Sequence, residues 1–179
     1  MDMITEKDLK ILHTEDELQL GIAKLGAKLN EVYANEELYV ICVLKGSVMF
    51  MVDLVKHLKM PLRMEFIRLS SYGSAFTSSG KVNAVDISLP DLNNKNVLIV
   101  EDIIDTGHTA KFLIDFIKLN FRAKSLKFCS LMDKKVKREV DIDADYYCFE
   151  VDDKFLVGYG LDYDGYYRNL PYIGYIANT

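Results

Sequence analysis

The segment from Asn96 to Thr109 constrains the fold of this chain more than any other stretch. Asn96 to Val100 has strand length, and its residues from Val97 on form a continuous apolar run, typical of a strand buried on both faces of a sheet. Two adjacent carboxylates, Glu101 and Asp102, follow, and Asp105-Thr-Gly-His-Thr109 then opens a helix. A strand that leads into a helix is the repeating unit of α/β folds. Ligands of such folds bind at the carboxyl ends of the strands, so this segment also predicts where the site lies.

The residue types of this turn favour a phosphate ligand. A helix N-terminus offers unpaired N–H groups and the positive end of the helix dipole. Gly107 lets the backbone approach a ligand closely, and Thr106 and Thr109 add hydroxyl donors. Glu101 and Asp102 do not suit a phosphate. Sugar hydroxyls, or Mg²⁺ with its waters, are the partners that fit these two carboxylates.

Helical and strand patterns alternate along the rest of the chain, which predicts an α/β fold. Thr14 and Glu17 form a capping box that starts a helix ending near Ala34. Its apolar stripe consists of Leu18, Ile22, Leu25, Leu29 and Val32. Further helices are predicted at 48–58 and 109–119, the latter with Phe112, Leu113, Phe116 and Ile117 on one side. Further strands are predicted at 39–44, 64–69, 96–100, 125–132, 146–151 and 155–159.

The stretch from Ser70 to Asn83 has a different composition. It contains five serines, one threonine and two glycines among fourteen residues. Such a stretch buries too little apolar surface to offset its ordering entropy, so we expect a mobile loop. Long loops of this kind in compact domains are often lids over a site. A surface hairpin without a function is the alternative.

Length, charge and cysteine content exclude several classes of protein. At 179 residues the chain is expected to form one domain, residues 1–179. Its net charge of −5 argues against nucleic-acid partners. Its apolar runs are far shorter than a membrane span, and its N-terminus has no signal-peptide core. The three cysteines form no C-x-x-C pair, which suits a reducing cytosol, and we expect a cytoplasmic protein.

The pattern of an apolar strand, two acids, two apolar residues and Asp-Thr-Gly-x-Thr resembles the phosphoribosyl-pyrophosphate signature of type I phosphoribosyltransferases. Other segments narrow the resemblance to hypoxanthine-guanine phosphoribosyltransferases. They are Leu44-Lys45-Gly46, Ser71-Tyr72, Lys134, Arg168 and the run from Asp153 to Tyr163. The motifs occur in the family's order from about residue 35 to 175.

The resemblance implies a role for each matching residue on the phosphoribosyl side. Ile104, Asp105, Thr106, Gly107, His108 and Thr109 would bind the 5′-phosphate. Glu101 and Asp102 would bind the ribose and, with Asp162, the shell of a Mg²⁺ cofactor. Lys45, Gly46 and Arg168 would bind pyrophosphate, and the Leu44–Lys45 peptide is expected to be cis. Ser71 and Tyr72 would belong to the lid, residues 70–83. His108, at the variable position, would contact phosphate or face solvent.

Other residues are implied to bind the base. Lys134 would donate to the purine 6-oxo group, Phe155 would stack on the ring, and the Leu156 carbonyl would accept from a 2-amino group. Asp162 would lie beside them on the magnesium side, and Asp105 would act as the general base or proton partner at N7. Asp133 precedes Lys134, and an ion pair between the two would draw Lys134 away from the base.

The implied fold is a mostly parallel central sheet flanked by helices, with a purine hood from residues 150–179 and the N-terminal region. In the implied reaction of purine salvage, N9 of a 6-oxopurine (hypoxanthine or guanine) displaces pyrophosphate from the ribose C1 of phosphoribosyl pyrophosphate, giving IMP or GMP. The family usually forms homodimers or homotetramers. Two alternatives stay open. One is a regulator that senses phosphoribosyl pyrophosphate while binding RNA or DNA, which would need a basic face. The other is a transferase acting on xanthine or a pyrimidine.

Overall fold

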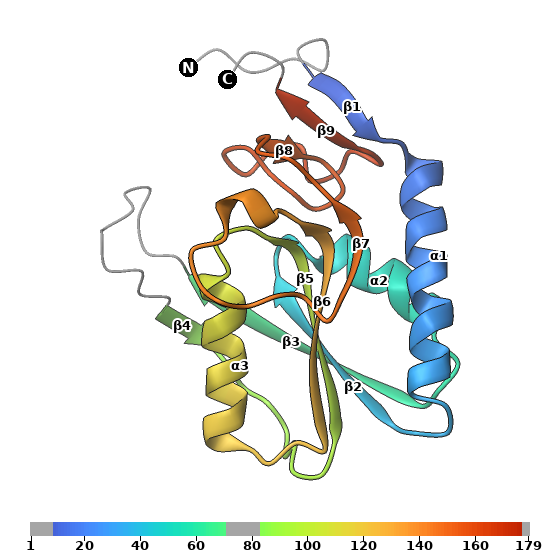
Figure 1. The fold of residues 1–179 in the computed structure, drawn as a ribbon, viewed down its shortest axis with the longest axis vertical. Helices are drawn as coiled ribbons and strands as arrows, with labels where there is room; N and C mark the ends of the chain where they lie inside the picture. The colour runs from blue at the N-terminus through green and yellow to red at the C-terminus, as the bar shows by residue number, and fades with distance from the viewer. Residues whose placement is uncertain (1–8, 71–82, 177–179) are drawn as a thin grey trace.

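A six-stranded sheet forms the centre of the molecule in the computed structural model, which describes residues 9–70 and 83–176 (Figure 1). In chain order its strands are β2 (Leu38–Leu44), β3 (Leu62–Ser70), β4 (Asn83–Asp86), β5 (Asn96–Ile104), β6 (Ser125–Asp133) and β7 (Tyr146–Glu150). They lie in the order β4-β3-β2-β5-β6-β7, and only β4 runs antiparallel to its neighbour. The predicted mostly parallel sheet is therefore confirmed.

Helices cover both faces of this sheet, because its central strands are apolar on both sides. They are α1 (Glu15–Val32), α2 (Val48–Lys56) and α3 (His108–Asn120), with a short 3₁₀ turn, η2 (Lys135–Lys137), after β6. Val40 and Cys42 of β2 pack with α1 and α2, whereas Tyr39 and Ile41 pack with α3. This alternation of side chains along one strand produces a separate core on each face. None of the helices in the described ranges is long and apolar enough to cross a membrane.

A second, smaller sheet lies above the carboxyl edge of the large one (Figure 1). It is antiparallel and joins β1 (Leu9–His13), β9 (Ile173–Ile176) and β8 (Leu156–Val157) in that order. β1 and β9 are strands that the sequence analysis did not predict. Leu9 pairs with Ile176, so the first and last described residues are neighbours. We call β1, β9, β8 and the loops of residues 158–172 the hood.

The first helix begins as predicted but ends earlier. The Thr14 side chain accepts from the Glu17 N–H, and the Glu17 carboxylate accepts from the Thr14 N–H at 2.8 Å, which completes the capping box. Val32, predicted to lie on the apolar stripe, is half exposed, and Tyr33 is buried instead. The helix ends at Val32, and Tyr33 lies four residues after buried Leu29, where the stripe continues.

Several other boundaries differ from the prediction, and two of these differences concern the proposed lid and β8. Ser70 and Asn83 belong to β3 and β4 and pair with each other, so the two ends of the proposed lid are strand residues. Residues 71–82, with Ser71 and Tyr72, lie outside the described residues. The strand predicted at 155–159 is limited to β8, because Gly158 (φ 96°), Tyr159 (φ 48°) and Gly160 (φ 99°) have left-handed backbone that ends an extended chain.

Candidate active site

The predicted site residues meet at the carboxyl edge of the large sheet. Parallel pairing brings the ends of β2, β5 and β6 together, and the loops that follow them carry the chemistry-bearing residues. Lys45 and Gly46 follow β2, and the Leu44–Lys45 peptide is cis, as the resemblance implied. Glu101 and Asp102 lie within β5, which continues to Ile104 and so extends beyond residue 100, the predicted strand end.

The two acids of β5 are held in surroundings that disfavour their charge. Glu101 is only 7% exposed. Burial, and then the neighbouring Asp102 charge, raises the pKa of Glu101 well above its ordinary value. Burial also raises the pKa of Asp102 to about 6, although its own bond from the Ile103 N–H (2.9 Å to Oδ1) and the Arg168 charge oppose this rise. Two such carboxylates side by side are stabilised by a cation or by hydroxyl donors.

Gly46 is enclosed between this acid pair and the hood. A Cβ atom built on Gly46 would lie 1.5 Å from Asp102 Oδ2, and one built on Gly160 would lie 1.9 Å from the Gly46 carbonyl oxygen. The loop after β2 thus packs against a β5 carboxylate on one side and the hood backbone on the other. Only glycine at residue 46 permits this approach.

Arg168 and Asp162 form the hood side of the same site. The Arg168 guanidinium donates to the Gly160 carbonyl and pairs with Asp162 Oδ1. The second oxygen of Asp162 accepts from the Gly165 N–H at 2.8 Å. Because the Arg168 and Asp162 charges both act on the pKa of Asp102, the predicted pyrophosphate and metal residues belong to one electrostatic unit.

The loop from Asp105 to Thr109 forms the start of α3 as predicted. Gly107 is the N-cap of α3 and has φ 87°, a conformation that favours glycine. The His108 N–H lies 3.5 Å from Thr106 Oγ1, a long contact. The His108 ring lies 2.9 Å from a Glu139 oxygen, so His108 has a carboxylate partner within the chain.

Lys134 lies between the catalytic candidate and the hood. Its Nζ is 3.0 Å from Asp153 Oδ1, 3.1 Å from the Lys154 carbonyl and 3.9 Å from Asp105 Oδ2. The predicted danger of an ion pair with Asp133 is not realised. Asp133 pairs with Arg138 instead, because that guanidinium reaches the buried end of β6. The sequence analysis predicted neither the pairing of Arg138 with Asp133 nor that of Asp153 with Lys134. The one available signal was that an acidic residue directly precedes Lys134 in the sequence.

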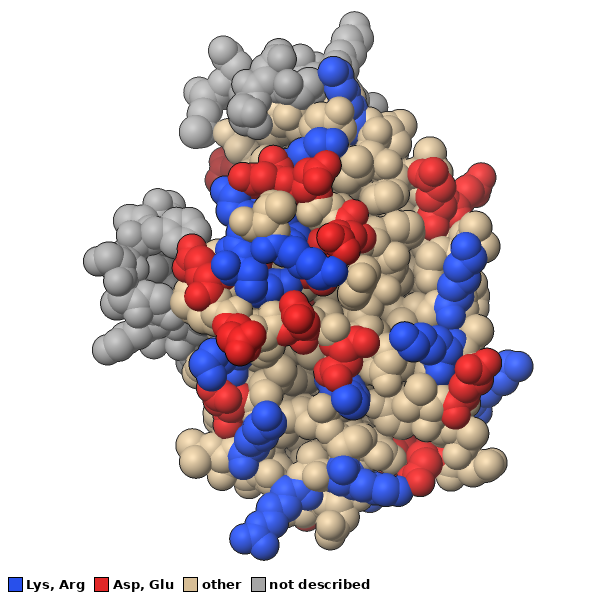
Figure 2. All heavy atoms as spheres, in the orientation of Figure 1, with Lys and Arg blue, Asp and Glu red and all other residues tan. Residues whose placement is uncertain are grey.

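The surroundings of Lys134 are charged but balanced. Lys135 pairs with Glu150, Lys137 with Asp153 and Arg138 with Asp133. Figure 2 accordingly shows Lys and Arg gathered among Asp and Glu in the upper part of the molecule, rather than a broad field of one sign.

The two base-binding candidates Phe155, just before β8, and Leu156, its first residue, differ in exposure. Phe155 is 47% exposed and meets the Tyr163 ring edge-on at 5.6 Å between centroids. It follows Lys154, whose carbonyl accepts from Lys134, so Phe155 is adjacent to the Lys134 end of the site. The Leu156 side chain is buried in the core, which leaves its backbone as the group able to contact a ligand.

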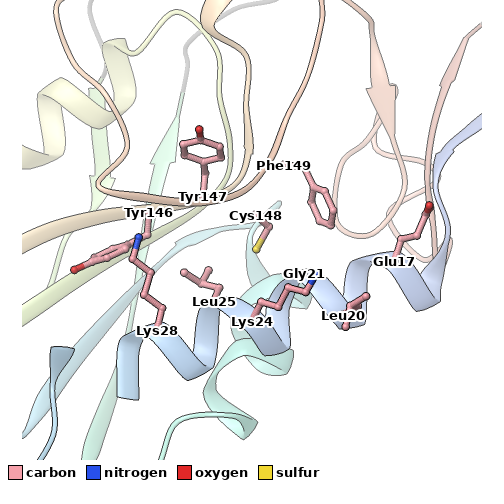
Figure 3. A pocket seen from close by; sticks show the side chains of 10 residues that line it. All are labelled: Glu17, Leu20, Gly21, Lys24, Leu25, Lys28, Tyr146, Tyr147, Cys148 and Phe149. Carbon is pink, nitrogen blue, oxygen red and sulfur yellow. The ribbon is translucent and has the colours of Figure 1, made fainter. Parts of the chain in front are cut away.

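A groove of about 350 Å³ lies elsewhere, between α1 and β7 (Figure 3). Leu20 and Lys24 line it on α1, and Tyr147 and Cys148 line it on β7. Lys28 lies over the Tyr146 ring at 5.1 Å. The residues that line this groove include none of the predicted site residues. The candidate active site is therefore defined by the convergence of loops at the sheet edge.

Comparison with known proteins agrees with this arrangement. Residues 8–164 match the family model described as phosphoribosyl transferase domain. A hypoxanthine-guanine phosphoribosyltransferase of Streptococcus thermophilus is 44% identical over 170 residues, covering 94% of each chain. The protein of the same name from Streptococcus pneumoniae is 46% identical over 170 residues, again 94% of each.

Solved structures agree as well. A hypoxanthine phosphoribosyltransferase of Staphylococcus aureus superposes with a TM-score of 0.91 at 40% identity, covering 98% of this chain and 96% of that one. A hypoxanthine-guanine phosphoribosyltransferase of Bacillus anthracis gives 0.88 at 41% identity, covering 93% and 98%. The chain therefore belongs to the phosphoribosyl transferase domain family, and within it to the hypoxanthine-guanine phosphoribosyltransferases.

Proposed function

We propose that this chain transfers the 5-phosphoribosyl group from phosphoribosyl pyrophosphate to N9 of hypoxanthine or guanine, releasing pyrophosphate and IMP or GMP, with Mg²⁺ as cofactor. One observation carries the proposal. The acid pair of β5, the glycine-capped helix start and the Lys134–Asp105 pair meet at one sheet edge. The relatives reported above are named hypoxanthine-guanine phosphoribosyltransferases, and these three groups suit that activity.

The phosphoribosyl group occupies the β5–α3 turn in this proposal. The first N–H groups of α3 and the hydroxyls of Thr106 and Thr109 bind the 5′-phosphate, with the Gly107 backbone in close approach. The ribose hydroxyls lie over Glu101 and Asp102. A hydroxyl group can donate a hydrogen bond to a carboxylate, whereas an ionised phosphate cannot. Lys45 and Arg168 neutralise the departing pyrophosphate.

Magnesium suits the residues present, although it requires substrate oxygens as well. Among the described residues no cluster of three or more His, Cys, Asp or Glu side chains could hold a metal alone. Mg²⁺ commonly binds through one or two carboxylates together with waters and substrate phosphates. Buried Glu101 and partly exposed Asp102, with Asp162 nearby, fit this type of site. When bound, Mg²⁺ would neutralise charge on the leaving pyrophosphate.

The base binds at the opposite end of the site, between Asp105 and Phe155. Lys134 has donors and no acceptor, so it favours a 6-oxo purine over a 6-amino purine. The Asp105 side chain is 43% exposed and its Oδ2 lies 3.9 Å from Lys134 Nζ, which leaves this oxygen able to accept a proton or hydrogen bond from the purine N7. The half-exposed Phe155 ring offers a stacking surface.

A spectrophotometric assay of the purified chain tests the proposal. Hypoxanthine, guanine, xanthine and adenine are offered in parallel with phosphoribosyl pyrophosphate and Mg²⁺, and Asp105→Asn is run beside the wild type. We expect turnover of hypoxanthine or guanine, dependent on Mg²⁺ and lost by a factor of about 10² or more in the variant, as is typical of a removed general base. Exclusive turnover of xanthine or adenine would refute the base assignment.

A further inference from the structure

Arg138 joins three parts of the chain beneath the phosphate-binding turn. One of its terminal nitrogens donates to the Asp105 carbonyl at 2.8 Å, and the other lies 2.5 Å from Asp133 Oδ1. The side chain is only 12% exposed. Arg138 follows η2, Asp133 ends β6, and Asp105 follows β5. A single planar guanidinium therefore connects the ends of two strands.

Asp133 makes this connection rigid. Its side chain is 1% exposed, and its second oxygen has no hydrogen-bond partner in the described part of the chain, with Lys135 Nζ at 3.9 Å. A buried carboxylate is strongly unfavourable without a close cation. Arg138 supplies that cation, and Lys134 is left to face Asp153 and Asp105.

The turn itself rests on this guanidinium and its neighbours. The Glu139 N–H donates to the Thr106 carbonyl at 3.0 Å. A Cβ atom on Gly107 would lie 2.8 Å from Ile142 Cγ2, 2.9 Å from Val140 Cγ2 and 3.1 Å from Arg138 Cδ, so Arg138 is one of three side chains that pack against the turn. The Asp105 carboxylate has little of its own to orient it, because one oxygen has no partner and the other is 3.9 Å from Lys134. Its direction is therefore set through its backbone.

We propose that Arg138 is a positioning residue for the transfer reaction: it fixes the Asp105 peptide, and with it the aim of the catalytic carboxylate and the first turn of the phosphate loop. This inference rests on the proposed function for its catalytic consequence. Asp133 has a different role, which is to neutralise and orient Arg138. The two roles can be separated by mutation.

The experiment compares Arg138→Met, Asp133→Asn and the double variant with wild type. For each, kcat, the KM values of phosphoribosyl pyrophosphate and hypoxanthine, and the urea midpoint are measured. Lys111→Gln serves as control, because it removes a cation from α3 whose partner is the exposed Asp115. We expect Arg138→Met to lose both stability and about 10² in kcat/KM, the loss typical of a misplaced reacting group.

The double variant decides the matter. It no longer buries an unpaired carboxylate, so we expect its urea midpoint to recover toward that of Asp133→Asn while its kcat stays low. Asp133→Asn alone keeps the acceptor for Arg138, and we expect its kcat within a few-fold of wild type. Recovery of both kcat and stability in the double variant would overturn the proposal, because Arg138 would then act only by neutralising Asp133. Wild-type kcat in Arg138→Met would overturn it as well.

A readout that needs no substrate separates this proposal from the proposed function. Amide hydrogen exchange of peptides covering residues 104–109 is measured in the free protein. We expect faster exchange in the double variant than in Asp133→Asn, at equal urea midpoint, because the Asp105 carbonyl has lost its donor. Unchanged exchange would refute the positioning role. A wild type that turns over no base would refute the proposed function and leave the exchange result to decide on Arg138.

Discussion

Replacing Gly46 by alanine tests whether the β2 loop must touch the acid pair. The new Cβ would lie 1.5 Å from Asp102 Oδ2, whereas real Cβ contacts are essentially never under 3.0 Å, so loop or carboxylate must shift by about 1.5 Å or more. A displacement of about 1 Å at a reacting centre can cost 10² in rate. We therefore expect Gly46→Ala to lower kcat/KM for phosphoribosyl pyrophosphate by at least about 10².

Gly165→Ala is the matched control for this experiment. A Cβ there meets nothing within 4 Å, although φ is 82°, so only a strain of about 1 to 2 kcal/mol is expected. Steady-state kinetics and urea unfolding are measured for both variants. Gly165→Ala should lose stability and keep kcat/KM within a few-fold. Wild-type kcat/KM in Gly46→Ala would show that the close approach to Asp102 has no part in catalysis.

Three further predictions concern stability. Asp102→Asn should stabilise the metal-free protein above pH 7 by up to about 3 kcal/mol while lowering activity. The pKa of Asp102 is raised from 3.8 to about 6 in the folded protein, so wild-type stability falls as pH rises through 6. Urea unfolding in EDTA at pH 5 and pH 8 measures this difference, and a less stable variant at pH 8 would contradict it. Tyr159→Phe removes a donor to the Asp53 carboxylate and should cost about 1.5 to 3 kcal/mol by the same measurement. Thr14→Ala removes the α1 cap and should cost about 1 kcal/mol, with kcat unchanged.

The parallel sheet was predictable because its central strands are continuous apolar runs in the sequence. β2 and β5 are apolar on both faces, and the helices between strands begin at recognisable signals such as the Thr14 capping box. β1 and β9 carry no such signal. Each has four or five residues with mixed burial, and the two pair with each other from opposite ends of the described chain, so local periodicity does not reveal them.

The location of the site followed from topology, whereas its internal contacts did not. Because parallel strands end at a common edge, residues 45–46, 101–109 and 134 could be brought together from sequence. The approach of Gly46 to Asp102, and the choice of Arg138 over Lys134 as partner of Asp133, depend on side-chain directions at strand ends. A list of motifs contains no such information. The roles assigned to individual residues, including Ser71 and Tyr72 beyond the described ranges, stay predictions.

The pairing of Leu9 with Ile176 has a consequence for how the protein is made. A ribosome adds roughly 5–20 residues per second, so β1 emerges on the order of ten seconds or more before the strand that completes its sheet. The large sheet needs neither β1 nor β9 and can form first. The hood, which contains Arg168 and Asp162, is completed only after β9 has been synthesised. A nascent chain released before β9 would have the large sheet and the β5–α3 turn but an incomplete hood, so we expect premature termination to abolish the proposed transfer activity.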